Sequence, residues 1–121
     1  MANHTLKLTN GAKRLAHQML NVPDLKTPAE KFRAGLLQEL LDHKVPHEKA
    51  LKKVDGTKPL TDEVERLLEE QEAWFLEEAS VEVTDSQRDL LRTICTNHAD
   101  KLPTGKPANR LLLELGLIEN P

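Results

Sequence analysis

Apolar residues recur along most of this chain at separations of three, four and seven positions. That spacing places them on one face of an α-helix, with polar residues on the opposite face. The pattern predicts helices over residues 9–20, 28–42, 46–54, 61–78, 85–99 and 107–115.

Signals for helix starts agree with this periodicity. Thr27 is an N-cap residue, Pro28 occupies the first helical position, and Glu30 follows three residues after the cap. Thr84 and Gln87 have the spacing of a second capping box. Such caps satisfy backbone N–H groups that have no partner inside the helix, so they fix where a helix begins.

The fold class predicted from these patterns is all-α. The one strand-like fragment, "SVEV" at residues 80–83, is too short to found a sheet, and the leucine-rich composition with 2% aromatic residues favours helices. We expect a compact bundle of five or six short helices with Trp74 and Phe75 in its core. Residues 1–121 form one domain in this prediction, with a possible hinge near 55–60, "DGTKPL".

A weak internal repeat is visible at an offset of 75 positions. Sliding residues 8–41 by that offset gives nine identities in 34 positions: Thr9/Thr84, Leu15/Leu90, Lys26/Lys101, Pro28/Pro103, Lys31/Lys106, Leu36/Leu111, Leu37/Leu112, Glu39/Glu114 and Leu40/Leu115. A duplication would give two related helical hairpins around a pseudo-two-fold axis. Chance matching between leucine-rich helices remains the alternative.

Charge is distributed unevenly, although the formal net charge is only −3. Residues 1–58 hold 11 Lys or Arg against 6 Asp or Glu, whereas residues 59–121 hold 6 against 14. Such asymmetry either marks an interaction surface or lets the two halves attract each other within one fold.

The sequence lacks the patterns of disulfide pairing, secretion and membrane insertion. The chain has one cysteine and therefore no internal disulfide. Its first residues lack the pattern of a secretory signal, and no apolar stretch is long enough to span a bilayer. We expect a cytoplasmic protein with no membrane partner.

The stretch "LLDHKVPHEKALKKV", residues 40–54, combines a helix end, a turn and a new helix. Four lysines in or beside it, Lys44, Lys49, Lys52 and Lys53, are candidate contacts to phosphate or to a partner. The second helix lacks the Arg, Asn and Gln residues that discriminate bases best, and the turn lacks glycine. The alternative is that this stretch is only a corner of the bundle.

Catalytic and metal-binding patterns are weak. Pro46 separates His43 from His47, so these histidines do not share one helical face. Cys95 has no CxxC partner, and with His98 it lies on an aliphatic stripe without a Gly-rich element. The sequence therefore predicts neither an enzyme nor a bound cofactor or metal.

The leading functional prediction is a non-catalytic protein–protein interaction module, such as an adaptor, regulator or inhibitor. A small accessory protein of the kind that a phage encodes fits this description, as do many bacterial proteins. Arg33, within an apolar stripe, and Leu76, outside one, are candidate partner contacts. The alternative is a nucleic-acid-associated protein whose basic, helix-turn-helix-like N-terminal half contacts the phosphate backbone. Homo-oligomerisation stays open.

Overall fold

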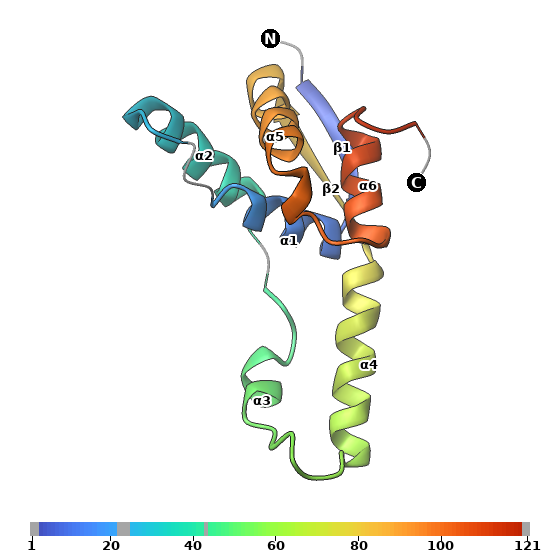
Figure 1. Ribbon diagram of the computed structural model, residues 1–121. Coiled ribbons are helices and arrows are strands. Elements are labelled where there is room, and N and C mark those ends of the chain that lie inside the picture. The colour runs from blue at the N-terminus through green and yellow to red at the C-terminus, as the bar shows by residue number, and fades with distance from the viewer. Residues whose placement is uncertain (1–2, 22–24, 43, 120–121) are drawn as a thin grey trace.

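The computed structural model describes residues 3–21, 25–42 and 44–119 of the chain (Figure 1). Its elements follow in the order β1 (Asn3–Thr9), α1 (Asn10–Met19), α2 (Pro28–Leu40), α3 (Glu48–Lys52), α4 (Asp62–Leu76), β2 (Glu78–Thr84), α5 (Asp85–Asn97), the short 3₁₀ helix η1 (Ala99–Lys101) and α6 (Lys106–Glu114). The protein is mostly helical, as the sequence predicts, and the predicted helices are all present with slightly different ends.

The all-α prediction is wrong in one respect, because β1 and β2 pair into a two-stranded antiparallel ribbon. The register runs from Asn3 opposite Thr84 to Thr9 opposite Glu78. The fragment "SVEV" is too short to form a sheet by itself, but it lies within β2, which pairs with β1 at the start of the chain. Alternating apolar residues give each strand one face that can be buried.

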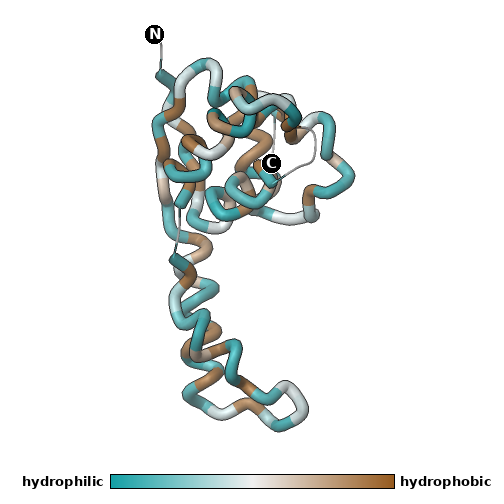
Figure 2. The backbone as a smooth tube through the Cα atoms, turned by 90° about the vertical axis from the view of Figure 1, so that its left-hand side faces the viewer, coloured by the Kyte–Doolittle hydropathy of each residue, from teal (hydrophilic) through white to brown (hydrophobic). Residues whose placement is uncertain are grey.

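The ribbon has a covered face and an uncovered face. Leu6, Leu8 and Val83 point to the covered face, where they are at most 1% exposed. They pack with leucines of the helices, including Leu37, Leu91, Leu111 and Leu115, in a single core cluster. Figure 2 shows the ribbon along one edge of the body, with the helices on a single side of it.

Two strand–helix–helix units make up the body. The first is β1-α1-α2 and the second is β2-α5-α6, and the strand bounds of the two units differ by 75 residues. Leu6 pairs with Val81, which is also 75 residues away, so a pseudo-two-fold axis passes through the centre of the ribbon. The internal repeat thus corresponds to two strand–helix–helix units, rather than to two helical hairpins.

The second helices of the two units are related by a different offset. The buried residues Ala34, Leu37 and Leu41 correspond in spacing to Ala108, Leu111 and Leu115, each 74 positions later. Leu36 is therefore not the counterpart of Leu111, although the identity at 75 positions pairs them. Because of this one-residue offset, the Leu36 side chain points away from the core, and it is 44% exposed.

The second helix of each unit packs against the other unit. The α6 helix of the second unit packs against α1 and β1 of the first, and α2 of the first packs against α5 of the second. Each second helix therefore covers apolar residues of the other unit, and the two units share one core.

The helices α3 and α4 follow the first unit in the sequence and precede the second. In space they form an arm that projects away from the body (Figure 1). The α3 helix packs against α4, and the Gln71 side chain donates a hydrogen bond to the Pro46 carbonyl at 3.0 Å. The segment 55–60 joins these helices at the arm's tip, and its role as a hinge stays a prediction. The prediction that Trp74 and Phe75 lie in the core is wrong. Both are half-buried at the arm's base, because only this end of α4 reaches α1.

Candidate functional site

The uncovered face of the ribbon carries a row of polar side chains. We call it the outer ribbon face; its exposed residues are Asn3, Thr5, Lys7, Glu78, Ser80 and Glu82. Thr5 lies opposite Glu82, and Lys7 lies opposite Ser80. These side chains share one face because alternate residues of a strand point to the same side of a sheet.

Local interactions hold this face in position. A one-residue slip of either strand would turn its buried leucines or valines outward, so the core fixes the register. Each strand then runs directly into a helix. Thr9 Oγ1 accepts a hydrogen bond from Ala12 N–H at 3.2 Å, and Thr84 Oγ1 accepts one from Gln87 N–H at 3.2 Å. Both ends of the ribbon are therefore tied to helix N-termini.

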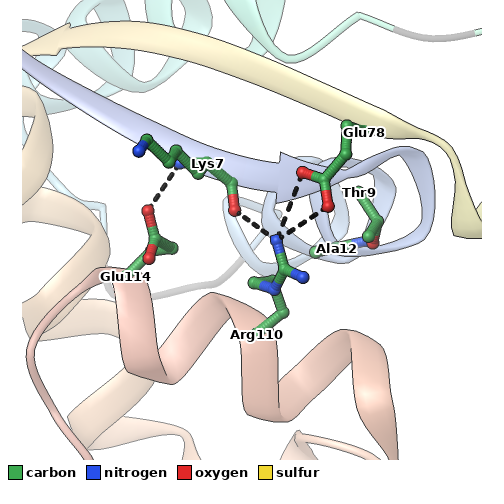
Figure 3. Close-up of polar contacts among 6 residues, drawn as sticks. All are labelled: Lys7, Thr9, Ala12, Glu78, Arg110 and Glu114. Atoms are coloured by element: carbon green, nitrogen blue, oxygen red, sulfur yellow. Dashed lines mark hydrogen bonds and ion pairs between the residues drawn. The ribbon is translucent and has the colours of Figure 1, made fainter.

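Two side chains of α6 close the free edge of β1 (Figure 3). Glu114 accepts a hydrogen bond from Lys7 N–H at 2.6 Å, and Arg110 donates one to the Lys7 carbonyl at 2.9 Å. Arg110 also contacts the Glu78 carboxylate at 3.2 Å. The Lys7 backbone is thereby held, while its side chain remains exposed on the outer ribbon face.

The four lysines predicted to contact phosphate lie on the arm, away from the ribbon. Lys49 and Lys52 belong to α3, with Lys44 and Lys53 on either side of it, and all four are exposed. Lys52 forms an ion pair with Glu48 at 3.2 Å. A helix-turn-helix corner would need α3 to pack against α2, but α3 packs against α4. Their contact with phosphate or a partner stays a prediction.

The two candidate partner contacts lie in different parts of the molecule. Arg33 is exposed on α2, where it lines a cavity of about 410 Å³ with Glu30 and Asp89, so its charge is not buried. Leu76 is 57% exposed at the end of α4. The structure does not bring these two residues together with the arm lysines.

Within the described residues, no group of three or more His, Cys, Asp or Glu side chains is arranged to hold a metal ion. His43 lies outside those residues. His47 contacts Glu70 at 2.7 Å, and this hydrogen bond lowers the pKa of the Glu70 carboxyl below its ordinary value. These two residues join α3 to α4 on the arm.

The Cys95 thiol is a poor candidate nucleophile. It is 1% exposed in the core, and burial raises its pKa to about 11. We expect labelling of Cys95 by a chromogenic disulfide reagent at pH 8 to be on the order of 100-fold slower than in denaturant, because little thiolate forms and access is blocked. Equal rates in the native and denatured protein would contradict this placement.

The outer ribbon face was not predicted from the sequence. The signal was the alternation in "TLKLT", residues 5–9, which matches the "SVEVT" of residues 80–84. Each run is short, and only their pairing in space makes the alternation a sheet.

No helix in the described part of the chain has the length and apolar character needed to cross a bilayer. Comparisons with protein-family models, with curated proteins and with solved structures give no match for this chain. The outer ribbon face and the arm are the most distinctive surfaces of the described residues.

Proposed function

We propose that this protein binds duplex DNA by placing the outer ribbon face in the major groove. The observation that carries this proposal is a two-stranded ribbon with one face in the core and the other polar and uncovered. The major groove, about 12 Å wide, admits a two-stranded ribbon whose strands are about 4.8 Å apart. Several DNA-binding proteins use a β-ribbon in this way.

The side chains on the face have the chemistry needed to distinguish base pairs. Lysine donates to the acceptors of guanine, and the asparagine amide matches adenine, so Lys7 and Asn3 are suited to purines. A glutamate accepts from the cytosine amino group, which suits Glu82. The hydroxyls of Thr5 and Ser80 donate or accept with either base type.

The pseudo-two-fold axis relates residues of unlike charge. Under the 75-residue equivalence, Lys7 corresponds to Glu82, and Thr5 corresponds to Ser80. A symmetric ribbon favours a palindromic site, because each half meets the same base edges. Here the β1 half is basic and the β2 half acidic, so the preferred DNA site is expected to have two different halves.

Carboxylates on the face also limit non-specific attraction to phosphate. Glu82 is exposed, whereas Glu78 is partly neutralised by Arg110. Base contacts must then supply much of the affinity. We expect few phosphate contacts and a log–log salt slope of about −2 to −3, from two or three neutralised phosphates.

The test is selection from a pool of random duplexes with the immobilised full-length protein, followed by fluorescence anisotropy of the enriched duplex at several salt concentrations. The expected result is one enriched, non-palindromic sequence that binds more tightly than a shuffled duplex of equal composition. The single strand of the selected sequence is the control. Absence of enrichment, with flat anisotropy at low salt, would refute DNA binding.

A further inference from the structure

The two edges of the ribbon are treated differently. Arg110 and Glu114 of α6 hydrogen-bond the Lys7 backbone and so close the edge of β1. The equivalent positions of α2, 74 residues earlier, are Leu36 and Leu40. Leucine side chains cannot hydrogen-bond a strand, so the device that closes one edge has no counterpart at the other.

The unpaired groups on β2 follow from the ladder pattern. Asn10 N–H donates to the Glu77 carbonyl at 2.9 Å, and hydrogen-bonded pairs recur at every second residue of an antiparallel ladder. The backbone groups of Ser80 and Glu82 therefore point away from β1. Within the residues that the structure describes, they make no hydrogen bond across this edge. A strand edge of this kind is a template for a further strand.

An apolar stripe on α2 reaches one end of this edge. Phe32, Leu36 and Leu40 are spaced by one helical turn along α2, and they are 67%, 44% and 44% exposed. Leu36 lines a small cavity together with Thr84, the last residue of β2, and Gln87. Leu36 therefore brings the stripe next to the Thr84 end of β2.

From this combination, we infer that the β2 edge binds an extended segment of another protein as a third strand, in which apolar and basic residues alternate. A residue opposite Glu82 would point to the outer ribbon face, where a lysine or arginine complements the carboxylate. Its neighbours would point to the helix side, where Leu36 is exposed beside the end of β2. The chain itself contains this pattern in β1, where Leu6, Lys7 and Leu8 pair with the other edge of β2.

Charge argues against a second copy of this chain as the occupant. Antiparallel pairing of two β2 strands about Ser80 would place Glu78 of one copy opposite Glu82 of the other. The antiparallel register shifted by two residues would place Glu82 opposite Ser80, so neither register gives Glu82 a cation opposite it. Like charges opposite each other destabilise a sheet, so a basic segment fits this edge better.

The experiment measures binding of a fluorescent heptapeptide, TLKLKLT, to the full-length protein by anisotropy. Ser80→Pro removes the outward N–H and adds a ring at an edge position where proline is tolerated, so affinity should fall by about 10-fold. Ser80→Ala keeps the N–H and is the matched control. Glu82→Lys should weaken the lysine peptide by about 3-fold to 10-fold and strengthen binding of TLELELT.

Each other result overturns the inference. Equal affinities of the Ser80→Pro and Ser80→Ala variants would show that the edge is not used. Absence of peptide binding, with self-association that Ser80→Pro abolishes in sedimentation, would assign the edge to a second copy. Circular dichroism checks the fold of each variant. If Ser80→Pro does not fold, a peptide N-methylated along one edge takes its place, and unchanged affinity of that peptide would again exclude strand pairing.

Discussion

Leu8→Ala is expected to lower the free energy of unfolding by about 2–5 kcal/mol, the range for a leucine truncated in a closed core. Leu8 is 0% exposed, and it lies in the ribbon where the helices of both units meet. A loss of this size should lower Tm by about 6–30 °C in a chain of this length. Thermal and urea unfolding followed by circular dichroism measure the effect.

Leu36→Ala is the matched control for this prediction, because it removes the same atoms from a side chain that is 44% exposed. Its expected cost is below about 1 kcal/mol, since the lost side chain was already in contact with water. Equal losses for the two variants would contradict the placement of Leu8 in the core and Leu36 outside it. The comparison also tests the one-residue slip between α2 and α6.

Lys7→Met is expected to weaken binding of the selected duplex by about 5-fold to 150-fold, which corresponds to about 1–3 kcal/mol for one lost base contact. Methionine keeps an unbranched apolar stem, and the backbone bonds to Arg110 and Glu114 do not depend on the side chain. Binding of a shuffled duplex should change much less. Anisotropy titrations of both duplexes at one salt concentration give the two ratios.

The arm is the alternative DNA-binding surface to the outer ribbon face. If Lys49 and Lys52 contact phosphates, their double replacement by glutamine should weaken every duplex to a similar degree and make the salt slope shallower by about 2. If the outer ribbon face binds DNA, that variant should retain sequence preference and lose little affinity. A large uniform loss, with Lys7→Met unchanged, would place the DNA contact on the arm.

Helix positions could be predicted because the interactions that fix them are local. Thr27 and Thr84 cap helices that begin at the next residue, and Thr84 forms the predicted capping box with Gln87. These contacts span only three residues, so they can be recognised in the sequence. The candidate site was harder to predict. The outer ribbon face depends on pairing between strands 75 positions apart. Lys49 and Lys52 lie on a helix that the sequence predicts, but that helix packs on α4 through residues more than twenty positions away.

The sequence by itself determined the helices, the uneven charge and the repeat at 75 positions, because each depends on residue types and spacings within short stretches. The tertiary structure alone decided that residues 3–9 and 78–84 are strands, since neither run satisfies its backbone hydrogen bonds until the other lies beside it. It also decided that Leu111 is buried while Leu36 is exposed. The two leucines match in sequence, but a one-residue slip, about 100° of rotation on a helix, points one into the core and the other into solvent.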